Sequence, residues 1–139
     1  MHGVNLDMLG ARPSEHYGTL TLDELERRVK RDAAELGLEV RFFRTNHEGE
    51  FVEHLHRLQR LADAVLVNPG AWTHYSWAIR DALEIAALPS VEVHLSDLAA
   101  REDWRRHSVL EGLVLESVSG KGLAGYREGL ERLVRELER

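Results

Sequence analysis

The sequence contains no cysteine and no long apolar run. Without cysteine there can be no disulfide, no thiolate nucleophile and no cysteine-ligated zinc or iron–sulfur site. No apolar run approaches the roughly 20 residues of a membrane-spanning helix. No segment resembles a signal peptide either, so we expect a cytoplasmic protein with no membrane partner.

Clusters of basic residues are also missing. The chain has 18 Lys and Arg residues against 24 Asp and Glu, a formal net charge of −6, and the two signs are mixed along its length. A general nucleic-acid-binding surface needs clustered Lys and Arg, so we expect no nucleic-acid partner. The net charge does not describe a pocket, which can still bind an anion locally.

The sequence does contain an alternation of predicted helices and strands, and we expect residues 1–139 to form one domain. A helix is predicted from Thr21, with Glu24 completing a capping box and Gly37 as its stop. The further predicted elements are a strand over residues 38–43, a helix carrying Phe51, Leu55 and Leu58, a strand over 64–67, a helix over 76–87, a strand ending at His94, a strand near 112–118, and a last helix lined by Leu123, Tyr126, Leu130, Leu133 and Leu137. This order predicts a flavodoxin-like, three-layer α/β sandwich with a parallel sheet.

Polar residues follow two of the predicted strands at the point where each strand ends. They lie in the segments Asn68–His74 and Glu92–Ser96. Because ligands bind at the carboxyl ends of parallel strands, we expect His74 and His94 to converge on one crevice as acid, base or ligand-binding groups. A metal site from His74, His94 and Asp81 is a weaker alternative, since no compact ligand motif such as H-E-x-x-H is present.

Two further pairs of residues keep two interpretations open. Arg12 and Tyr17 lie five residues apart in a glycine-flanked loop, and a guanidinium can lower the pKa of a phenol only if it folds back onto it in a dry site. Arg101 and Arg105 fit a salt-bridged surface turn as well as a pair that reaches substrate hydroxyls or a carboxylate. Ser96 follows a strand end, where free backbone N–H groups could hold an anion.

Taken together, these segments resemble one known family. Residues Asn5–Gly18 resemble the loop N-L-L-G-x-R-x-P-x-x-Y-G of type II 3-dehydroquinate dehydratases, with the proline one place early. The segment Asn68–Ala82 is similar to the family's second block, and the segments Glu92–Ser96 and Arg101–Ser108 are similar to its third. The blocks follow in one register over nearly the whole chain, which makes the resemblance specific.

The resemblance implies a hydro-lyase of the shikimate pathway that converts 3-dehydroquinate into 3-dehydroshikimate. In this family the elimination is anti, proceeds through an enolate and uses no metal or organic cofactor. The resemblance assigns the C2 proton to Tyr17 as the base, with Arg12 favouring the phenolate. It assigns protonation of the departing C1 hydroxyl to His94, and a water held against the enolate oxygen to Asn5.

The resemblance also implies how the substrate is held. Asn68 would position the substrate and the catalytic histidine, and the amides of Leu95 and Ser96 would bind the carboxylate. The ring hydroxyls would be held by His74, Arg105 and, from a neighbouring subunit, Asp81. The implied partner is a second copy of the chain, in trimers that assemble into a dodecamer, a tetramer of trimers.

Some positions depart from the family pattern and bear on the shape of the pocket walls: His2, Val4, Tyr75, Trp77 and Val109. An unrelated class of dehydroquinase uses a lysine Schiff base. Neither Lys30, on a predicted helix, nor Lys121, in a late turn, suits that role. The alternative function is a flavodoxin-like binder of a small anionic ligand without turnover, which the lack of a glycine-rich phosphate loop disfavours.

The start of the sequence raises a last expectation. In the family an apolar strand precedes the first motif and lies at the centre of the sheet, but only Met1, His2 and Gly3 precede Val4-Asn5 here. The first central strand is therefore expected to be truncated, and an upstream start codon is a hypothesis. We expect the middle of the sheet to be poorly filled and Asn5 to be loosely held.

Overall fold

The computed structural model describes the backbone of residues 1–139 and every side chain except that of Tyr17. Its α-helices are α1 (Ser14–Tyr17), α2 (Leu22–Glu35), α3 (Glu48–Arg57), α4 (Trp77–Ala86) and α5 (Leu123–Leu137), and its strands are β1 (Val65–Val67), β2 (Ser90–His94) and β3 (Glu116–Ser119). Short 3-10 helices cover Leu6–Met8, Leu58–Arg60, Gly70–His74, Leu98–Ala100 and Asp103–Arg105. None of the helices in the described chain is long and apolar enough to cross a membrane.

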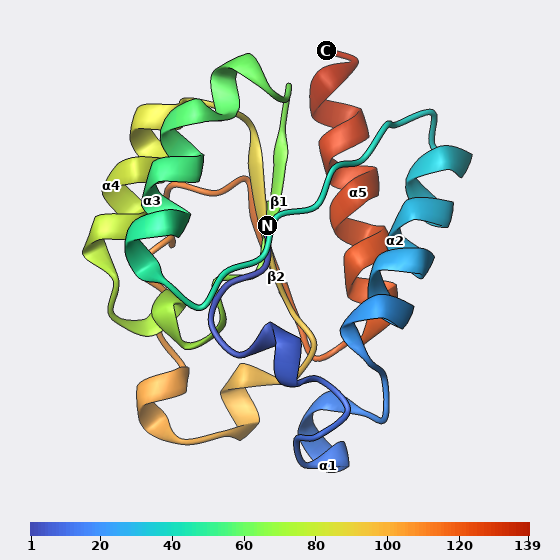
Figure 1. The fold of residues 1–139 in the computed structure, drawn as a ribbon, viewed down its shortest axis with the longest axis vertical. Helices are drawn as coiled ribbons and strands as arrows, with labels where there is room; N and C mark the ends of the chain where they lie inside the picture. The colour runs from blue at the N-terminus through green and yellow to red at the C-terminus, as the bar shows by residue number, and fades with distance from the viewer.

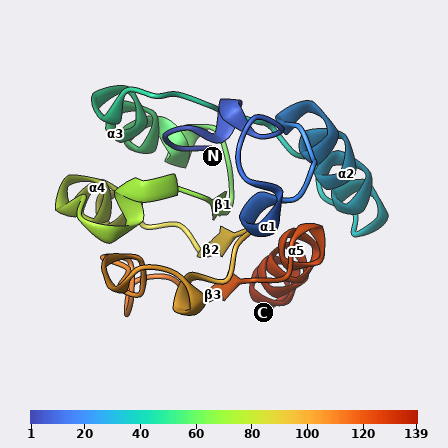
Figure 2. The same ribbon diagram turned by 90° about the horizontal axis from the view of Figure 1, so that it is seen from below.

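The strands form a parallel sheet between two layers of helices, as Figure 1 and Figure 2 show. The strand order is β1-β2-β3, with Val65 opposite Ser90 and Val91 opposite Glu116. Helices α3 and α4 cover one face of the sheet, and α2 and α5 cover the other. The predicted three-layer, flavodoxin-like sandwich is confirmed, and its parallel strands bring their carboxyl ends to one edge.

Each face of the sheet has its own apolar core. The face under α2 and α5 buries Leu25, Val29, Ala33, Val93, Leu130 and Leu133, among others. The face under α3 and α4 buries Phe51, Leu55, Trp72, Ile79 and Leu83, among others. Helix α5 approaches the sheet closely at Gly129, where an added Cβ would lie 2.6 Å from Leu66 Cδ1.

Local sequence signals place the helix ends as expected. Thr21 Oγ1 accepts a hydrogen bond from the Glu24 amide at 3.2 Å, so the predicted capping box begins α2. Gly37 follows α2 with a φ of 76°, the left-handed backbone that glycine adopts freely. Ser76 Oγ accepts from the Ile79 amide at 3.1 Å, which starts α4 directly after the polar segment Asn68–His74.

The predicted strand over residues 38–43 is wrong. The segment is extended, with Leu38, Val40 and Phe42 turned inward and Glu39 and Arg41 exposed, as the alternation of residue types predicts. However, no described residue forms a hydrogen bond with the backbone of residues 39–42. A strand needs a neighbour for its N–H and C=O groups, and this segment has one only near its end, where Arg44 pairs with His2.

A groove separates residues 38–43 from β1. Its volume is about 570 Å³, and apolar side chains from the extended segment, from β1, from α2 and from α5 line most of it. Among the described residues, backbone pairing joins the two sides of the groove at His2, which forms isolated parallel bridges with Arg44 and with Asn68. The expectation of a poorly filled sheet centre is thus confirmed.

Candidate active site

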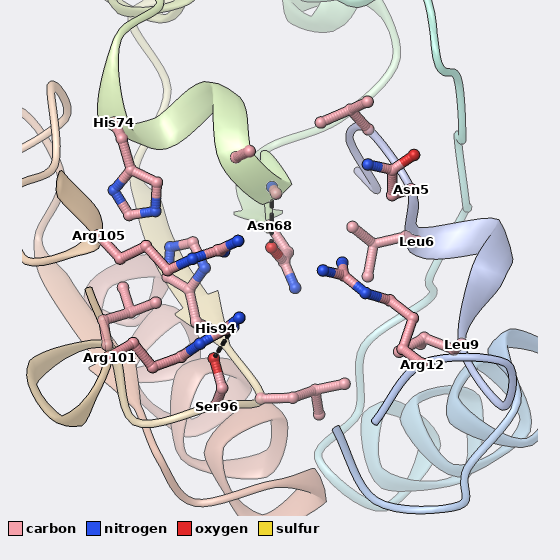
Figure 3. Close-up of a pocket in the computed structure, with 15 residues that line it drawn as sticks. Asn5, Leu6, Leu9, Arg12, Asn68, His74, His94, Ser96, Arg101 and Arg105 are labelled. Atoms are coloured by element: carbon pink, nitrogen blue, oxygen red, sulfur yellow. Dashed lines mark hydrogen bonds between the residues drawn. The ribbon is translucent and has the colours of Figure 1, made fainter. Parts of the chain in front are cut away.

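A pocket opens where β1 and β2 end, and Figure 3 shows the side chains that surround it. Its cavity volume is about 90 Å³. Residues from three parts of the chain line it: the first loop, the segment after β1 and the segment after β2. The predicted site residues in this lining are Asn5, Arg12, Asn68, His74, His94, Leu95, Ser96 and Arg105.

His94, at the end of β2, rests on a buried carboxylate. Its Nε2 lies 2.6 Å from Oε2 of Glu92, whose side chain is fully buried. Glu92 also accepts hydrogen bonds from the hydroxyls of Thr73 and Ser108, the latter at 2.7 Å. The carboxylate therefore has three donors around it, and the strand, the segment after β1 and the loop before β3 all contribute to holding it.

These contacts decide the protonation of the pair. Burial acts to raise the pKa of Glu92, but the hydrogen bonds from His94, Thr73 and Ser108 outweigh it, and the pKa lies below its ordinary value. An ionised carboxylate can only accept, so Nε2 of His94 carries the hydrogen in this contact. The other nitrogen, Nδ1, is left as the position where a second proton can be gained and given away.

Sequence analysis assigned no role to Glu92, Thr73 or Ser108. The signal for Glu92 was available, because residues two apart on a strand point to the same face, and Glu92 and His94 lie on one predicted strand. A charged residue in a buried parallel strand is itself unusual and requires partners. Thr73 and Ser108 are distant in sequence from Glu92, so only the fold brings them to it.

Asn68, the first residue after β1, is held at both ends of its side chain. Its Nδ2 donates to the hydroxyl oxygen of Tyr126 at 3.1 Å, and its Oδ1 accepts from the Gly70 amide at 3.0 Å. Tyr126 lies on α5 and is buried, which raises the pKa of its phenol to about 12 and keeps it neutral. The second Nδ2 hydrogen of Asn68 remains for a ligand.

His74 and Arg105 form the opposite wall of the pocket from Asn5 and Arg12 (Figure 3). His74 Nδ1 lies 2.7 Å from the carbonyl oxygen of His107, so Nδ1 donates and Nε2 is left as an acceptor. Burial lowers the pKa of His74, and this favours the neutral ring. Trp104 supports both residues, with its ring 5.3 Å from His74 and 4.2 Å from the Arg105 guanidinium carbon.

The turn after β2 brings Leu95 and Ser96 to the floor of the pocket. The carbonyls of Leu95 and Ser96 accept hydrogen bonds from Gly122 and Gly120, at 3.4 Å and 3.0 Å, which fixes the backbone of the turn. Arg101 also lines the pocket, with Nη1 3.5 Å from Ser96 Oγ. Arg105 lines the pocket too, and its Nε donates to Glu102 Oε2 at 2.5 Å, so the structure contains the salt-bridged turn as well as two arginines that face the pocket.

The first loop supplies the remaining wall. Asn5 adopts a left-handed backbone with a φ of 68°, and its N–H donates to Asn46 Oδ1 at 2.8 Å. The backbone of Asn5 is therefore held, while its side chain is exposed. Figure 3 shows the Arg12 guanidinium pointing into the pocket. The side chain of Tyr17 lies outside the described residues, so its predicted role as the base is not addressed by the structure.

Asp81 is the predicted site residue that the structure does not bring to the pocket. It lies exposed on α4 and is not part of the lining. The weaker alternative of a metal site from His74, His94 and Asp81 is not supported. Among the described residues, no group of three or more His, Cys, Asp or Glu could hold a metal ion.

The pocket combines a histidine on a buried carboxylate with amide, hydroxyl and guanidinium donors. A neutral or anionic substrate rich in oxygen atoms suits such a lining, because each oxygen needs a directed hydrogen bond. The His94–Glu92 pair can deliver a proton, and the guanidinium groups of Arg12, Arg101 and Arg105 favour negative charge in the ligand or in a reaction intermediate.

The comparisons with known proteins agree with this geometry. The sequence model of the family described as Dehydroquinase class II matches residues 1–134. A 3-dehydroquinate dehydratase of Syntrophotalea carbinolica is 50% identical over 131 residues, covering 94% of this chain and 88% of that protein. A 3-dehydroquinate dehydratase of Carboxydothermus hydrogenoformans is 45% identical over 139 residues, covering 100% of this chain and 90% of that protein.

The fold agrees as well. The crystal structure of type II dehydroquinase from Propionibacterium acnes is similar with a TM-score of 0.91 and 40% sequence identity, covering 96% of this chain and 92% of that one. The match in sequence and in structure extends over the segments that form the pocket. The chain belongs to the class II dehydroquinase family.

Proposed function

We propose how this chain, a 3-dehydroquinate dehydratase of the shikimate pathway, uses its pocket to remove water from 3-dehydroquinate. As a hydro-lyase it forms 3-dehydroshikimate. The observation that carries the proposal is the contact of His94 with the buried carboxylate of Glu92, at the strand end where Asn68 and Ser96 also lie.

His94 acts as the general acid. When the C–O bond at C1 breaks, the leaving hydroxyl needs a proton, and Nδ1 of a protonated His94 can supply it while Nε2 stays bonded to Glu92. The Glu92 carboxylate stabilises the imidazolium before the transfer and fixes the plane of the ring. Asn68, held by Tyr126, positions the substrate next to this nitrogen.

Tyr17 removes the C2 proton, and the electrons pass to the neighbouring ketone to give an enolate. An ordinary phenol is a poor base at neutral pH, so the phenolate needs a positive charge beside it. Arg12, whose guanidinium points into the pocket, is proposed to supply that charge. Asn5, on the same wall, holds a water against the enolate oxygen, where preorganised donors give a large rate effect.

The substrate is held by groups of complementary character. The amides of Leu95 and Ser96, in the turn fixed by Gly122 and Gly120, bind the carboxylate. His74 Nε2 accepts a hydrogen bond from a ring hydroxyl, because Nδ1 is committed to the His107 carbonyl. Arg105 donates to a second hydroxyl from its position over Trp104.

We also propose that the chain works as a homo-oligomer, as trimers assembled into a dodecamer, in the cytoplasm and as one domain. Trp77, Asp81 and Ile85 follow one another at four-residue steps on α4, and Trp77 and Ile85 are 67% and 58% exposed. Together with Tyr75, 59% exposed, they form an apolar patch around a carboxylate. A second copy on this patch would bring Asp81 to its neighbour's substrate hydroxyls.

Turnover is tested by adding the purified protein to 3-dehydroquinate and following the absorbance of the enone product. We expect activity that survives a chelator and survives borohydride added with substrate. Tyr17→Phe should abolish kcat while leaving substrate binding largely intact, and Arg12→Ala should do nearly the same. A Tyr17→Phe variant that keeps most of its kcat would overturn the base assignment.

The shared site is tested by mixing two inactive variants. Asp81→Ala and His94→Ala should each lose activity, and mixed oligomers should regain part of it, because some pockets then combine an intact His94 with an intact neighbouring Asp81. Light scattering gives the mass of the assembly. A fully active monomer would contradict the shared site.

A further inference from the structure

Asn46 is not part of the pocket lining, but it contacts the backbone of Asn5, which is. Its Oδ1 accepts the N–H of Asn5 at 2.8 Å, and its Nδ2 donates to Oδ2 of Asp7 at 3.0 Å. The Asp7 carboxylate is also paired with Arg44, at 3.3 Å. We call these contacts of Asn46 with Asn5 and Asp7 the Asn46 latch.

Both ends of the Asn46 amide are used, and the partners fix which end is which. A backbone N–H can only donate and a carboxylate can only accept, so the oxygen must face Asn5 and the nitrogen must face Asp7. Aspartate in place of Asn46 would have the same shape but would offer a negative charge to Asp7. The latch therefore requires an amide at this position rather than a polar side chain of any kind.

The residues on either side of Asn46 are held by hydrogen bonds. The neighbouring Thr45 is buried, its N–H donates to the His2 carbonyl, and its hydroxyl donates to Glu50 Oε2 at 2.6 Å. The same hydroxyl oxygen accepts from the His47 amide at 2.9 Å. The latch thus joins the first loop to the start of α3 through a residue whose own backbone neighbours are held.

Asn5 needs such support, because its backbone is in an uncommon conformation. A non-glycine residue with a φ of 68° lies in the left-handed region, which L side chains seldom adopt. On its other side, the loop packs against the segment after β1 so closely that a Cβ on Gly70 would lie 2.4 Å from the Val4 carbonyl oxygen. The loop that carries Asn5 therefore lies between Gly70, which approaches Val4, and Asn46, which bonds the Asn5 N–H.

We infer that Asn46 is a positioning residue for the reaction, acting through Asn5. The direction of the Asn5 side chain follows from its backbone angles, and the latch fixes these angles by holding the Asn5 N–H. This inference rests on the proposed function, in which Asn5 holds a water against the enolate oxygen. A displaced Asn5 should weaken enolate stabilisation while leaving the groups that bind the carboxylate and ring hydroxyls in place.

The first experiment measures kinetics in a set of variants of residues 46 and 7. Asn46→Asp should lower kcat by about 10- to 100-fold, with KM changed less than about threefold, because misplacing one catalytic group has effects of this size. Asp7→Asn alone should stay within about threefold of the unchanged protein. Adding Asp7→Asn to Asn46→Asp should restore most of kcat, since an amide on residue 7 can donate to the new carboxylate.

A second comparison separates positioning from general stability. In an Asn5→Ala background, Asn46→Asp should lower kcat less than about threefold further, because its effect passes through Asn5. A purely structural role would lower kcat by the same factor in both backgrounds. Additive losses, or a double Asn46→Asp and Asp7→Asn variant that is no better than Asn46→Asp, would overturn the inference.

A readout without turnover keeps the two proposals apart. The Asn5 amide should exchange its hydrogen slowly in the unchanged protein and at least about tenfold faster in Asn46→Ala, whereas His47→Ala, next to it on the exposed surface, should change nothing. Unchanged exchange in Asn46→Ala would overturn the latch. A protein that fails to turn over 3-dehydroquinate, but shows the exchange response, would overturn the proposed function and leave the latch supported.

Discussion

Two regions of the sheet differ in how completely their polar groups are bonded and how closely they are packed: the pocket at the carboxyl ends of the strands, and the groove beside β1. At the carboxyl ends of the strands, the Glu92 carboxylate has three donors, both ends of the Asn68 amide are bonded, and the cavity is about 90 Å³. Between residues 38–43 and β1 there is a groove of about 570 Å³, and residues 39–42 form no backbone hydrogen bond with the described residues. The pocket is thus tightly bonded, while the region between residues 38–43 and β1 is loosely filled.

The contrast teaches that the pocket depends on short-range supports rather than on the whole sheet. Thr73 and Ser108 hold Glu92, the carboxylate behind His94, and Tyr126 holds Asn68. Of these three supports, only Tyr126 also lines the groove. Because the supports are local, we expect substitutions at the pocket to change catalysis strongly, and substitutions at the groove to change stability weakly.

The largest effect is expected for Glu92→Gln. The neutral amide cannot stabilise a protonated His94, and its NH₂ would donate to Nε2 and force the hydrogen of the ring onto Nδ1. We expect kcat to fall by about 10²- to 10⁴-fold, the range for losing a general acid, with the alkaline limb of the kcat–pH profile, where the general acid loses its proton, displaced to lower pH. Steady-state kinetics from pH 5 to 9 measure both quantities.

Ser108→Ala is the matched control for that change. It removes one of the bonds to Glu92 but keeps the carboxylate, so kcat should fall less than about tenfold. If Glu92→Gln keeps most of its kcat, His94 does not depend on the charge of Glu92. Equal losses of kcat in both variants, with an unchanged pH profile, would likewise give Glu92 a packing role alone.

A pair of phenylalanines compares the core with the groove directly. Phe51 on α3 is fully buried and packs edge-on against Trp72, with ring centroids 5.5 Å apart. Phe42 is half-buried and lines the groove. Phe51→Ala should lower the free energy of unfolding by about 3–5 kcal/mol, and Phe42→Ala by about 1 kcal/mol, because its site already borders an open cavity.

Chemical denaturation of the two variants measures these values. Equal losses would mean that the groove packs as tightly as the core in solution, which would erase the contrast between the two regions. The residual kcat of Phe42→Ala sharpens the comparison further, since we expect it to be unchanged.

The sequence predicted most of what local patterns can encode. The start of α2 at Thr21 and the strand ending at His94 follow from capping and from a buried apolar run, and both are confirmed. The strand predicted over residues 38–43 is wrong, because pairing depends on a neighbour that is distant in sequence, and His2 reaches only the end of the segment.

The site shows the same division. His74, His94 and Ser96 could be predicted because parallel strands must end at one edge, which is a property of the fold class. Asn46 and Ser108 could not, because their roles come from contacts over 41 and 16 residues of sequence that no periodicity records. Residues that support a site from behind are therefore the ones for which a structure is needed.

The last effect concerns His2, the residue that joins the two regions, and it is absent at neutral pH. Its ring is buried and stacked on Phe42, with centroids 5.9 Å apart. Burial, followed by the charges of the amino terminus and Arg44, lowers the pKa of His2 from its ordinary 6.5 to about 3. Between pH 6.5 and pH 3, His2 binds a proton in the unfolded chain but not in the folded chain. The free energy of unfolding therefore keeps its full value above pH 6.5 and falls as the pH decreases toward 3. One proton corresponds to a slope of about 1.4 kcal/mol per pH unit.

His2→Phe keeps a ring on Phe42 and removes the titration, so its free energy of unfolding should match that of the unchanged protein at pH 7 and exceed it by about 2 kcal/mol at pH 5. The Glu26 carboxylate, 3.2 Å from His2 Nε2, opposes this effect because it can stabilise a protonated ring. Urea denaturation of both proteins at pH 7, 6 and 5 shows whether burial or Glu26 dominates. If the free energy of unfolding changes with pH in parallel for the variant and the unchanged protein, Glu26 dominates and His2 accepts its proton in the folded state.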